Sequence, residues 1–404
     1  MSYRNPFVFR RKPRASRVAL ALAVTTLLLG SAATAANWEF APVIEGGWRT
    51  NDNYRLGLPT NEIDVSGAEV DAALTMRTVD PRLQIELTPR VRATKFPGDD
   101  DQDSTDYYFS GLIADSTPIR DLGIRGDFSR EDVVRSELPA PGDGGDLGSP
   151  ETGDSGRTLE RSKRSMWRVA PYWFYSVNEL NRLELDARYV DANFDNETGG
   201  NLQDFSETGV SAGWRHRYSE RSSFVFRAVA SQFDTQFTTD AYGADLQWDR
   251  QFSPLSRMYA RLGGRRTSSD ERGDDTSIIA GLGGRWASQR NQFFVDLTRT
   301  VEPISAGTVV ERYQLRLRLD HDISPRVALV LGARGMHDED IDDASAYPTR
   351  KYASGEVGFE WRLQRTLSLT ATYNRLWQEY EDEDADRNSN GFLISLVYEP
   401  KRTD

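Results

Sequence analysis

The sequence of 404 residues contains no cysteine, only three histidines and, apart from one stretch near its N-terminus, no long apolar run. Without cysteine the chain can have no disulfide framework, thiol nucleophile or thiolate metal site. A membrane-spanning helix needs about 20 consecutive apolar residues, and no segment beyond the N-terminus approaches this length. The sequence therefore excludes thiol chemistry and a bundle of membrane-spanning helices.

The N-terminal 36 residues are typical of a secretory signal peptide. Several basic residues precede the apolar run 18–29, and Ala33-Thr34-Ala35 then supplies small residues for cleavage. The run is too short to span a bilayer comfortably, although an uncleaved anchor is the alternative. We predict a signal peptide over residues 1–36 and a mature protein over residues 37–404.

Acidic residues outnumber basic residues in the predicted mature protein. Residues 1–36 carry six basic and no acidic side chains, so their removal leaves 44 basic and 62 acidic residues. This acidic balance disfavours nucleic acid as a partner.

The segment 311–321 shows the pattern that dominates the remaining chain. Its apolar residues Tyr313, Leu315, Leu317 and Leu319 alternate with polar residues, a period of two that indicates a β-strand with two different faces. In a soluble sandwich the apolar face would meet a second sheet, and in a membrane barrel it would meet lipid. The mean hydropathy of −0.61 does not decide between them, because a barrel needs only alternate residues to be apolar.

Eighteen such segments follow one another from Asn37 onward. They cover residues 38–48, 68–77, 83–93, 107–114, 122–128, 167–175, 182–189, 210–214, 224–230, 242–249, 257–265, 278–286, 293–297, 311–321, 327–333, 356–363, 367–373 and 392–398. The alternation over 107–114 is weak, so sixteen strands is the alternative count.

The connections between these segments are alternately short and long. Tight turns recur near Glu220, Pro254, Gln289, Pro325 and Arg365, and longer polar connections are expected at 195–204, 268–275, 337–348 and 381–390. A sandwich has no reason to sort its loops in this way. The pattern predicts an all-β fold, a transmembrane antiparallel up-and-down β-barrel with short periplasmic turns and longer extracellular loops.

Two further features fit this prediction. The nine tryptophans lie mostly near strand ends on the apolar side, as in the aromatic girdles of membrane barrels. A Gly/Pro/Asp-rich stretch at about 134–163 interrupts the alternation, which resumes beyond it, so we expect a long surface loop there rather than a domain linker. Such a loop could plug the lumen or form a flexible ligand-binding tip.

Arginines on the inward side of neighbouring strands form the leading candidate site. The predicted pore-lining residues are Arg257, Arg261, Arg265, Arg285, Arg312, Arg316 and Arg318, with Asp245, Asp249 and Asp296 on flanking strands. One interpretation is a field across a pore that attracts anionic solutes or sugars. The other is a ladder of cross-strand charge pairs that only satisfies a wet interior.

Catalytic and metal sites have little support in the sequence. His216 and His321 lie near short turns, and His337 begins an outer loop in an acidic run that resembles a solvated surface. The run 386–391 begins like an EF-hand loop, but its twelfth position is Val397, where calcium binding needs a glutamate. We predict no enzyme, no cofactor and no specific metal site.

The repeated turns carry a resemblance to a known family. Segments such as 252–258, 323–327 and 363–369 close an apolar strand, turn through Ser, Pro or Arg and open the next strand with a hydrophobe. This sequence pattern, over most of residues 160–398, resembles that of the outer-membrane porins of the beta-barrel porin 2 type. The resemblance implies an association with exopolysaccharide export or exosortase-type systems.

Together these observations predict a porin-like channel in the outer membrane for small hydrophilic solutes, with polysaccharide implied only by the resemblance. The alternatives are a non-conducting surface scaffold or adhesin and, less favoured, a barrel hydrolase. The expected partners are outer-membrane lipids and lipopolysaccharide, the barrel assembly machinery and a polysaccharide or periplasmic export partner.

Overall fold

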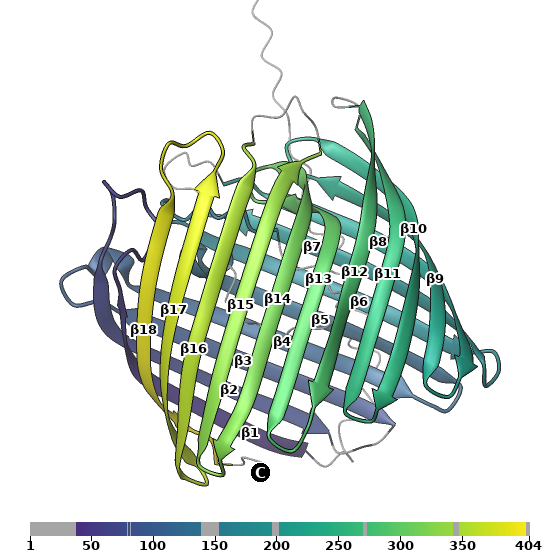
Figure 1. Ribbon diagram of the computed structural model, residues 1–404, viewed down its shortest axis with the longest axis horizontal. Coiled ribbons are helices and arrows are strands. Elements are labelled where there is room, and N and C mark those ends of the chain that lie inside the picture. Colours follow the sequence, from purple (N-terminus) through teal and green to yellow (C-terminus); the bar gives the residue numbers. More distant parts are fainter. Residues whose placement is uncertain are drawn as a thin grey trace, which may run out of the picture.

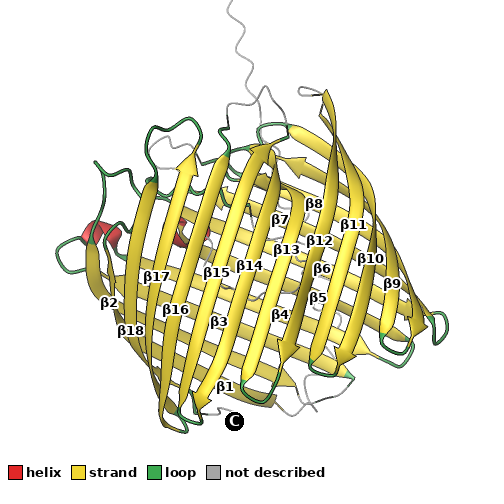
Figure 2. Cartoon of the chain, viewed as in Figure 1, coloured by secondary structure: helices red, strands yellow, loops and turns green. Residues whose placement is uncertain are grey.

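The protein is an antiparallel β-barrel of eighteen strands (Figures 1 and 2). The computed structural model describes residues 38–78, 80, 82–138, 153–195, 202–269, 273–341 and 347–400. The predicted signal peptide lies outside these residues. The strands are β1 (Trp38–Asn51), β2 (Val65–Thr78), β3 (Leu83–Lys95), β4 (Ser104–Ser116), β5 (Arg120–Asp132), β6 (Lys163–Ser176), β7 (Asn181–Phe194), β8 (Phe205–Ser219), β9 (Ser222–Asp234), β10 (Thr238–Ser253), β11 (Ser256–Ser269), β12 (Gly273–Ala287), β13 (Asn291–Ile304), β14 (Thr308–Ser324), β15 (Val327–Asp340), β16 (Arg350–Gln364), β17 (Leu367–Tyr380) and β18 (Arg387–Tyr398).

Each strand pairs with its neighbours in the sequence, and β1 closes the sheet by pairing with β18 from Ile44 opposite Tyr398 to Asn51 opposite Gly391. The predicted count of eighteen is confirmed, including the weakly patterned β4. Helical structure in the described residues is limited to α2 (Val133–Ser136) and a short 3-10 turn at Asp100–Gln102. None of the described helices has the length and apolarity that a membrane crossing requires.

The period-two alternation places apolar side chains on the outside of the barrel. Large hydrophobic residues such as Phe40, Trp48, Leu246, Leu262 and Phe359 are about half exposed there. A monomeric soluble protein rarely leaves so much contiguous apolar surface open to water. The outer wall is therefore suited to contact with lipid.

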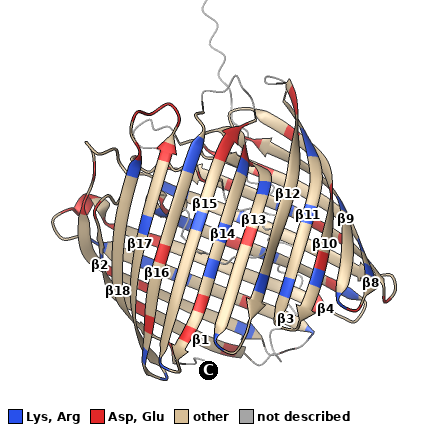
Figure 3. Cartoon of the chain, in the orientation of Figure 1, with Lys and Arg blue, Asp and Glu red and all other residues tan. Residues whose placement is uncertain are grey.

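The two ends of the barrel differ in their connections. At one end, which we call the turn end, the connections are 79–82, 117–119, 177–180, 220–221, 254–255, 288–290, 325–326 and 365–366. The other end, the loop end, carries the longer connections 52–64, 96–103, 133–162, 195–204, 341–349 and 381–386. Acidic residues gather in the connection between β17 and β18 at this end (Figure 3). The described chain begins and ends at the turn end, as an even number of strands requires.

Some predicted outer connections are shorter in the structure. Strands β11 and β12 extend to Ser269 and from Gly273, so most of the expected loop 268–275 is strand. Likewise, β15 continues to Asp340 and β18 begins at Arg387. The reason is that strand ends lying beyond the apolar belt need no apolar residues, so their composition resembles that of loops.

The β13–β14 hairpin leaves the wall of the barrel near the loop end. Pairing between β12 and β13 stops at Ala280 opposite Arg299, whereas β13 and β14 stay paired up to Ile304 opposite Thr308. Figure 1 shows the two strands β12 and β13 diverging toward this end. We call residues 300–310 the inner hairpin, because nearly all of them are buried inside the barrel.

Apolar contacts hold the inner hairpin in place. Val301 and Val309, on the side that elsewhere faces outward, pack against Phe233, Ala241 and Ile279, which face into the barrel from β9, β10 and β12. The hairpin tip also bonds to the β7–β8 connection, where the backbone N–H of Gln203 donates to the Ser305 carbonyl at 2.7 Å. The hairpin thus fills part of the loop-end half of the lumen with packed apolar side chains, and a pocket of about 370 Å³ remains between it and the ends of β10–β12.

Candidate functional site

The predicted pore-lining residues do not form one continuous cluster in the structure. Arg312, Arg316 and Asp296 are almost fully buried, and Asp245 is buried in a different part of the wall. Arg261, Arg265, Arg285, Arg318 and Asp249 are half-buried, and Arg257 is exposed near the turn end. Their surroundings divide them into structural ion pairs and residues that line a cavity.

Arg312 belongs to a buried network of charges under the inner hairpin. Its guanidinium lies 2.6 Å from Asp338, 2.9 Å from Asp154 and 3.0 Å from Glu302. Arg350 on β16 approaches the other oxygen of Asp154 at 2.9 Å. Every formal charge here has an opposite partner, as burial demands. Arg312 is therefore held by the protein and is not available to a solute.

Asp154 brings the connection between β5 and β6 into this network. Its burial raises the pKa, but the charges of Arg312 and Arg350 outweigh burial and hold the pKa of Asp154 below its ordinary value. The carboxylate is thus ionised and clamped between two strands of the wall.

Residues 153–162, which include Asp154 and which we call the docked segment, cross the lumen. The Ser155 carbonyl accepts a hydrogen bond from the Tyr380 hydroxyl at 2.6 Å, and Gln378 donates to the Gly156 carbonyl at 3.2 Å. Gly156 has φ +73°, and a Cβ there would lie 2.1 Å from the Gln378 side chain, so only glycine fits. On the other side Arg55 donates to the carbonyls of Thr158 and Glu160 at 3.0 and 2.9 Å.

The sequence predicts a surface loop over 134–163, whereas most of the described parts of it are buried. Residues 139–152 lie outside the described part of the chain. Glu137 is fully buried, and its carboxylate accepts hydrogen bonds from the Ser155 amide at 2.7 Å and from the Ser305 hydroxyl. These bonds connect the docked segment to the tip of the inner hairpin. A Gly- and Asp-rich composition favours a solvated loop, but here the polar groups find partners within the lumen.

Arg316 forms a second structural pair. It bonds to Asp296 on the neighbouring strand, and the Tyr259 hydroxyl donates to the same carboxylate. The Arg316 guanidinium also lies 5.5 Å from the centre of the Phe294 ring. This arrangement matches the charge-pair interpretation of the inward arginines.

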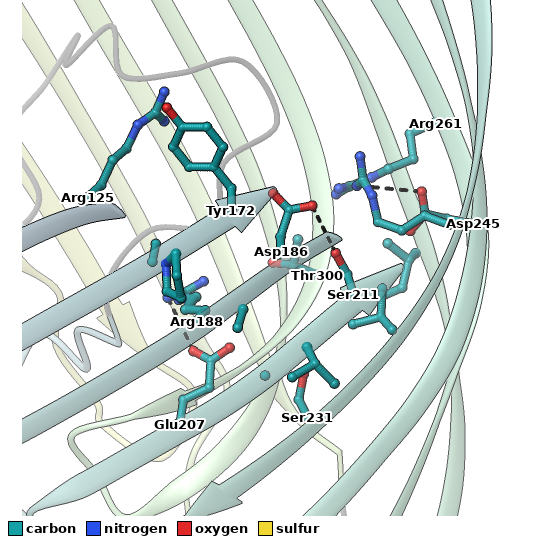
Figure 4. A pocket seen from close by; sticks show the side chains of 18 of the residues that line it. Arg125, Tyr172, Asp186, Arg188, Glu207, Ser211, Ser231, Asp245, Arg261 and Thr300 are labelled. Atoms are coloured by element: carbon teal, nitrogen blue, oxygen red, sulfur yellow. Dashed lines mark hydrogen bonds and ion pairs between the residues drawn. The ribbon is translucent and has the colours of Figure 1, made fainter. Parts of the chain in front are cut away.

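A cavity of about 560 Å³ occupies the lumen below the inner hairpin (Figure 4). It extends from Ser116 and Asp121 near the turn end to Thr300 and Glu302 on the hairpin. The wall formed by β5–β8 contributes Arg125, Tyr172, Arg182, Asp186, Arg188, Glu207 and Ser211, and the wall formed by β9–β11 contributes Arg227, Ser231, Asp245, Arg261 and Arg265.

Most charges of the cavity are engaged with one another. Arg188 lies 3.2 Å from Glu207, Arg182 lies 2.8 Å from Asp121, and Arg227 lies 3.8 Å from Asp245. Arg261 and Arg265 differ, because neither side chain has a hydrogen bond or an ion pair to any described residue. The Nε atom of Arg261 is buried without a partner. These two arginines therefore carry the positive charge that the cavity offers to a solute.

Sequence reasoning missed the wall formed by β5–β8. The alternation shows that Arg182, Asp186 and Arg188 share the polar side of β7. It does not show that β7 faces β11 across the lumen. Strands β5–β11 are consecutive in the sheet, and only the curvature of the barrel turns the inner faces of the two walls toward one cavity.

Among the described residues, each histidine has one polar side-chain partner. His216 and His321 each contact an asparagine, Asn181 at 3.0 Å and Asn291 at 2.7 Å, near the turn end. His337 contacts Glu339 at 2.8 Å on the outer side of β15. Among the described residues, no group of three or more histidines and carboxylates is placed to hold a metal ion.

Comparisons with known proteins show similarity at the level of solved structures. No family model matches the chain, and no curated protein matches it in sequence. The structure is similar to OccAB1 of Acinetobacter baumannii, with 9% identity, a TM-score of 0.46, and 90% of this chain and 97% of that chain covered. It is also similar to OccK2 (OpdF) of Pseudomonas aeruginosa, crystallised in complex with glucuronate, with 13% identity, a TM-score of 0.47, and 90% and 98% covered. The siderophore receptor PirA of Pseudomonas aeruginosa gives 8% identity and a TM-score of 0.41, with 89% and 80% covered. The resemblance to beta-barrel porin 2 proteins and the exosortase association stay predictions.

Proposed function

We propose that the protein is an outer-membrane channel through which small hydrophilic solutes pass. The observation that carries this proposal is the combination of an apolar outer wall with a polar lumen that holds a cavity of about 560 Å³. An eighteen-stranded barrel is wider than its own side chains can fill, so an aqueous lumen is expected.

The asymmetry of the two ends supports an orientation in the outer membrane. Short connections gather at the turn end and long ones at the loop end, as periplasmic turns and extracellular loops do in such barrels. In this orientation the cavity reaches toward the periplasmic side, where Ser116 and Asp121 line it. Lipopolysaccharide would surround the loop end, the barrel assembly machinery would insert the chain, and the predicted signal peptide would direct its export.

The inner hairpin and the docked segment lie across the loop-end half of the lumen, so we expect passage to require a movement. The inner hairpin and the docked segment must shift before a solute crosses the whole lumen. Export of a polysaccharide, which the resemblance implies, would require the same movement on a larger scale. The same filling also favours the second candidate, a non-conducting scaffold, because a permanently packed lumen would leave only the outer loops for function.

Conductance separates the two candidates. Refolded mature protein, residues 37–404, is placed in a planar bilayer, and currents are recorded under a salt gradient. Discrete openings support the channel. A folded protein that stays silent at all voltages supports the scaffold and contradicts the channel.

A further inference from the structure

We propose that the luminal cavity binds a hydroxylated organic anion such as a sugar acid, and that Arg261 and Arg265 select for its negative charge. This inference rests on the proposed function, because the cavity is the space through which a solute would pass. It adds a substrate class and two specificity-determining residues.

Charge is the first argument. Arg261 and Arg265 point into the cavity from β11 and have no hydrogen bond or ion pair with the described residues, whereas Arg188, Arg182 and Arg227 are paired with carboxylates. A guanidinium in a confined polar space attracts anions, and its planar donors suit a carboxylate. The cavity therefore favours a ligand that brings its own negative charge.

The opposite wall supplies acceptors for hydroxyl groups. Asp186 on β7 points into the same space as Arg261, and among the described residues its one hydrogen bond comes from the Ser211 hydroxyl at 3.3 Å (Figure 4). Ser231, on β9 between β7 and β11, adds a further hydroxyl to the lining. An ionised carboxylate can only accept hydrogen bonds, so Asp186 suits a ligand hydroxyl rather than a second anion.

An aromatic face and the cavity size complete the recognition. The ring of Tyr172 borders the cavity, with Arg125 placed 5.7 Å from its centre, and offers an apolar surface to the C–H groups of a sugar ring. The volume of about 560 Å³ lies within the range of small-molecule sites. A fatty acid would lack partners for the polar lining, and a neutral sugar would leave the two arginines without a counter-charge.

Binding is tested on the detergent-folded protein, so that the result does not depend on conduction. Calorimetric titration with galacturonate is compared with titration by galactose, which lacks only the carboxylate. We expect galacturonate to bind at least about tenfold more tightly, since a hydrogen bond to a charged group exceeds the free energy of a tenfold change. Equal affinity for the two sugars would overturn the proposal, as would the absence of measurable galacturonate binding.

The double variant R261Q/R265Q should lose at least about tenfold in affinity for galacturonate, whereas R290Q, which removes an exposed arginine of the β12–β13 turn, should bind as the wild type does. Unchanged binding by the folded double variant would assign the anion site to other residues. If the double variant does not fold, the salt dependence of galacturonate binding to the wild type still tests the proposal. Binding through the charges of Arg261 and Arg265 must weaken as salt rises. Salt-independent affinity contradicts the proposal.

The two proposals can fail separately. Galacturonate binding without conductance would support this site and refute the channel. Conductance without galacturonate binding would support the channel and refute this site.

Discussion

The carboxylate of Asp154 lies 2.9 Å from the guanidinium of Arg350, although the two residues are far apart in the chain and both are almost fully buried. Asp154 also contacts Arg312, so a single side chain of the β5–β6 connection joins two strands of the distant wall. This contact holds the docked segment across the lumen. This ion-pair network therefore adds to the hydrogen bonds from Tyr380, Gln378 and Arg55 that hold the segment.

The variant D154N should release the docked segment. Removing one partner of a buried ion pair leaves the other charge uncompensated, which costs about 3–5 kcal/mol. Limited trypsin digestion checks this, because Arg157 lies within the segment and becomes cleavable when the segment leaves the lumen. The control is D195N, whose aspartate forms a half-exposed pair with Arg130 at the loop end. Equal digestion of wild type and D154N would show that other contacts hold the segment.

Arg316 and Arg261 should respond to substitution in opposite ways. R316Q breaks the buried pair with Asp296 and should destabilise the barrel by about 3–5 kcal/mol in guanidinium unfolding. R261Q removes a side chain that has no hydrogen bond or ion pair with the described residues, and it should change the unfolding free energy by less than about 1 kcal/mol. In bilayers, however, R261Q should shift the reversal potential toward cations. A selectivity change in R316Q without destabilisation would contradict this division.

A disulfide should fix the inner hairpin to the β7–β8 connection. The hydrogen bond from the backbone N–H of Gln203 to the Ser305 carbonyl places the two residues side by side, and a disulfide can bridge Cα atoms up to about 6.8 Å apart. Because the chain has no native cysteine, Q203C/S305C contains the only thiols. Oxidised protein should be non-conducting and reduction should restore openings, with the two single variants as controls. Unaltered conductance after complete oxidation would mean that solutes bypass the hairpin.

The fold was largely predictable from the sequence, because period-two alternation reports which face of a strand meets lipid. Even β4 was found, and its weak pattern has a physical cause: Tyr108 faces inward, beneath Arg90, where a polar residue is expected. The inner hairpin was not predicted, since Val301 and Val309 have the parity of lipid-facing residues. The available signal was apolar residues on the opposite parity, such as Phe233 and Ile279, close to the loop end. The candidate site was only half predicted, because pairing partners such as Asp154 come from a connection whose path the alternation does not encode.

Docking of the segment should be tightest near pH 4–5. Burial raises the pKa of Glu137 above its ordinary value of 4.5, with Arg164 at 3.7 Å opposing this and Asp154 adding to it. Docking therefore strengthens as pH falls through the raised pKa. The pKa of Asp154 is lowered below 3.8, so its stabilisation is present above 3.8 and is lost as pH falls through the lowered value.

Hydrogen exchange of the Ser155 amide, corrected for its intrinsic pH dependence, measures docking directly. E137Q should abolish the change between neutral pH and pH 5 and leave the loss at lower pH. Protection that is independent of pH in the wild type would show that Glu137 does not titrate in this range.

Adjacent residues of β10 provide a test of which side of the wall meets lipid. Leu246 is half exposed on the outer face, midway along the apolar belt, and Gln247 faces the lumen beside Asp249. An arginine on the lipid side of a barrel costs about 2–4 kcal/mol near the bilayer midplane, whereas luminal substitutions are tolerated. We therefore expect L246R to lower the free energy of unfolding in lipid vesicles by that amount and Q247R to change it by less than about 1 kcal/mol. In detergent micelles the difference between the two variants should shrink, because water and headgroups reach the wall more easily. If both variants unfold alike in vesicles, the outer wall is not embedded in hydrocarbon, and the proposed channel loses its premise.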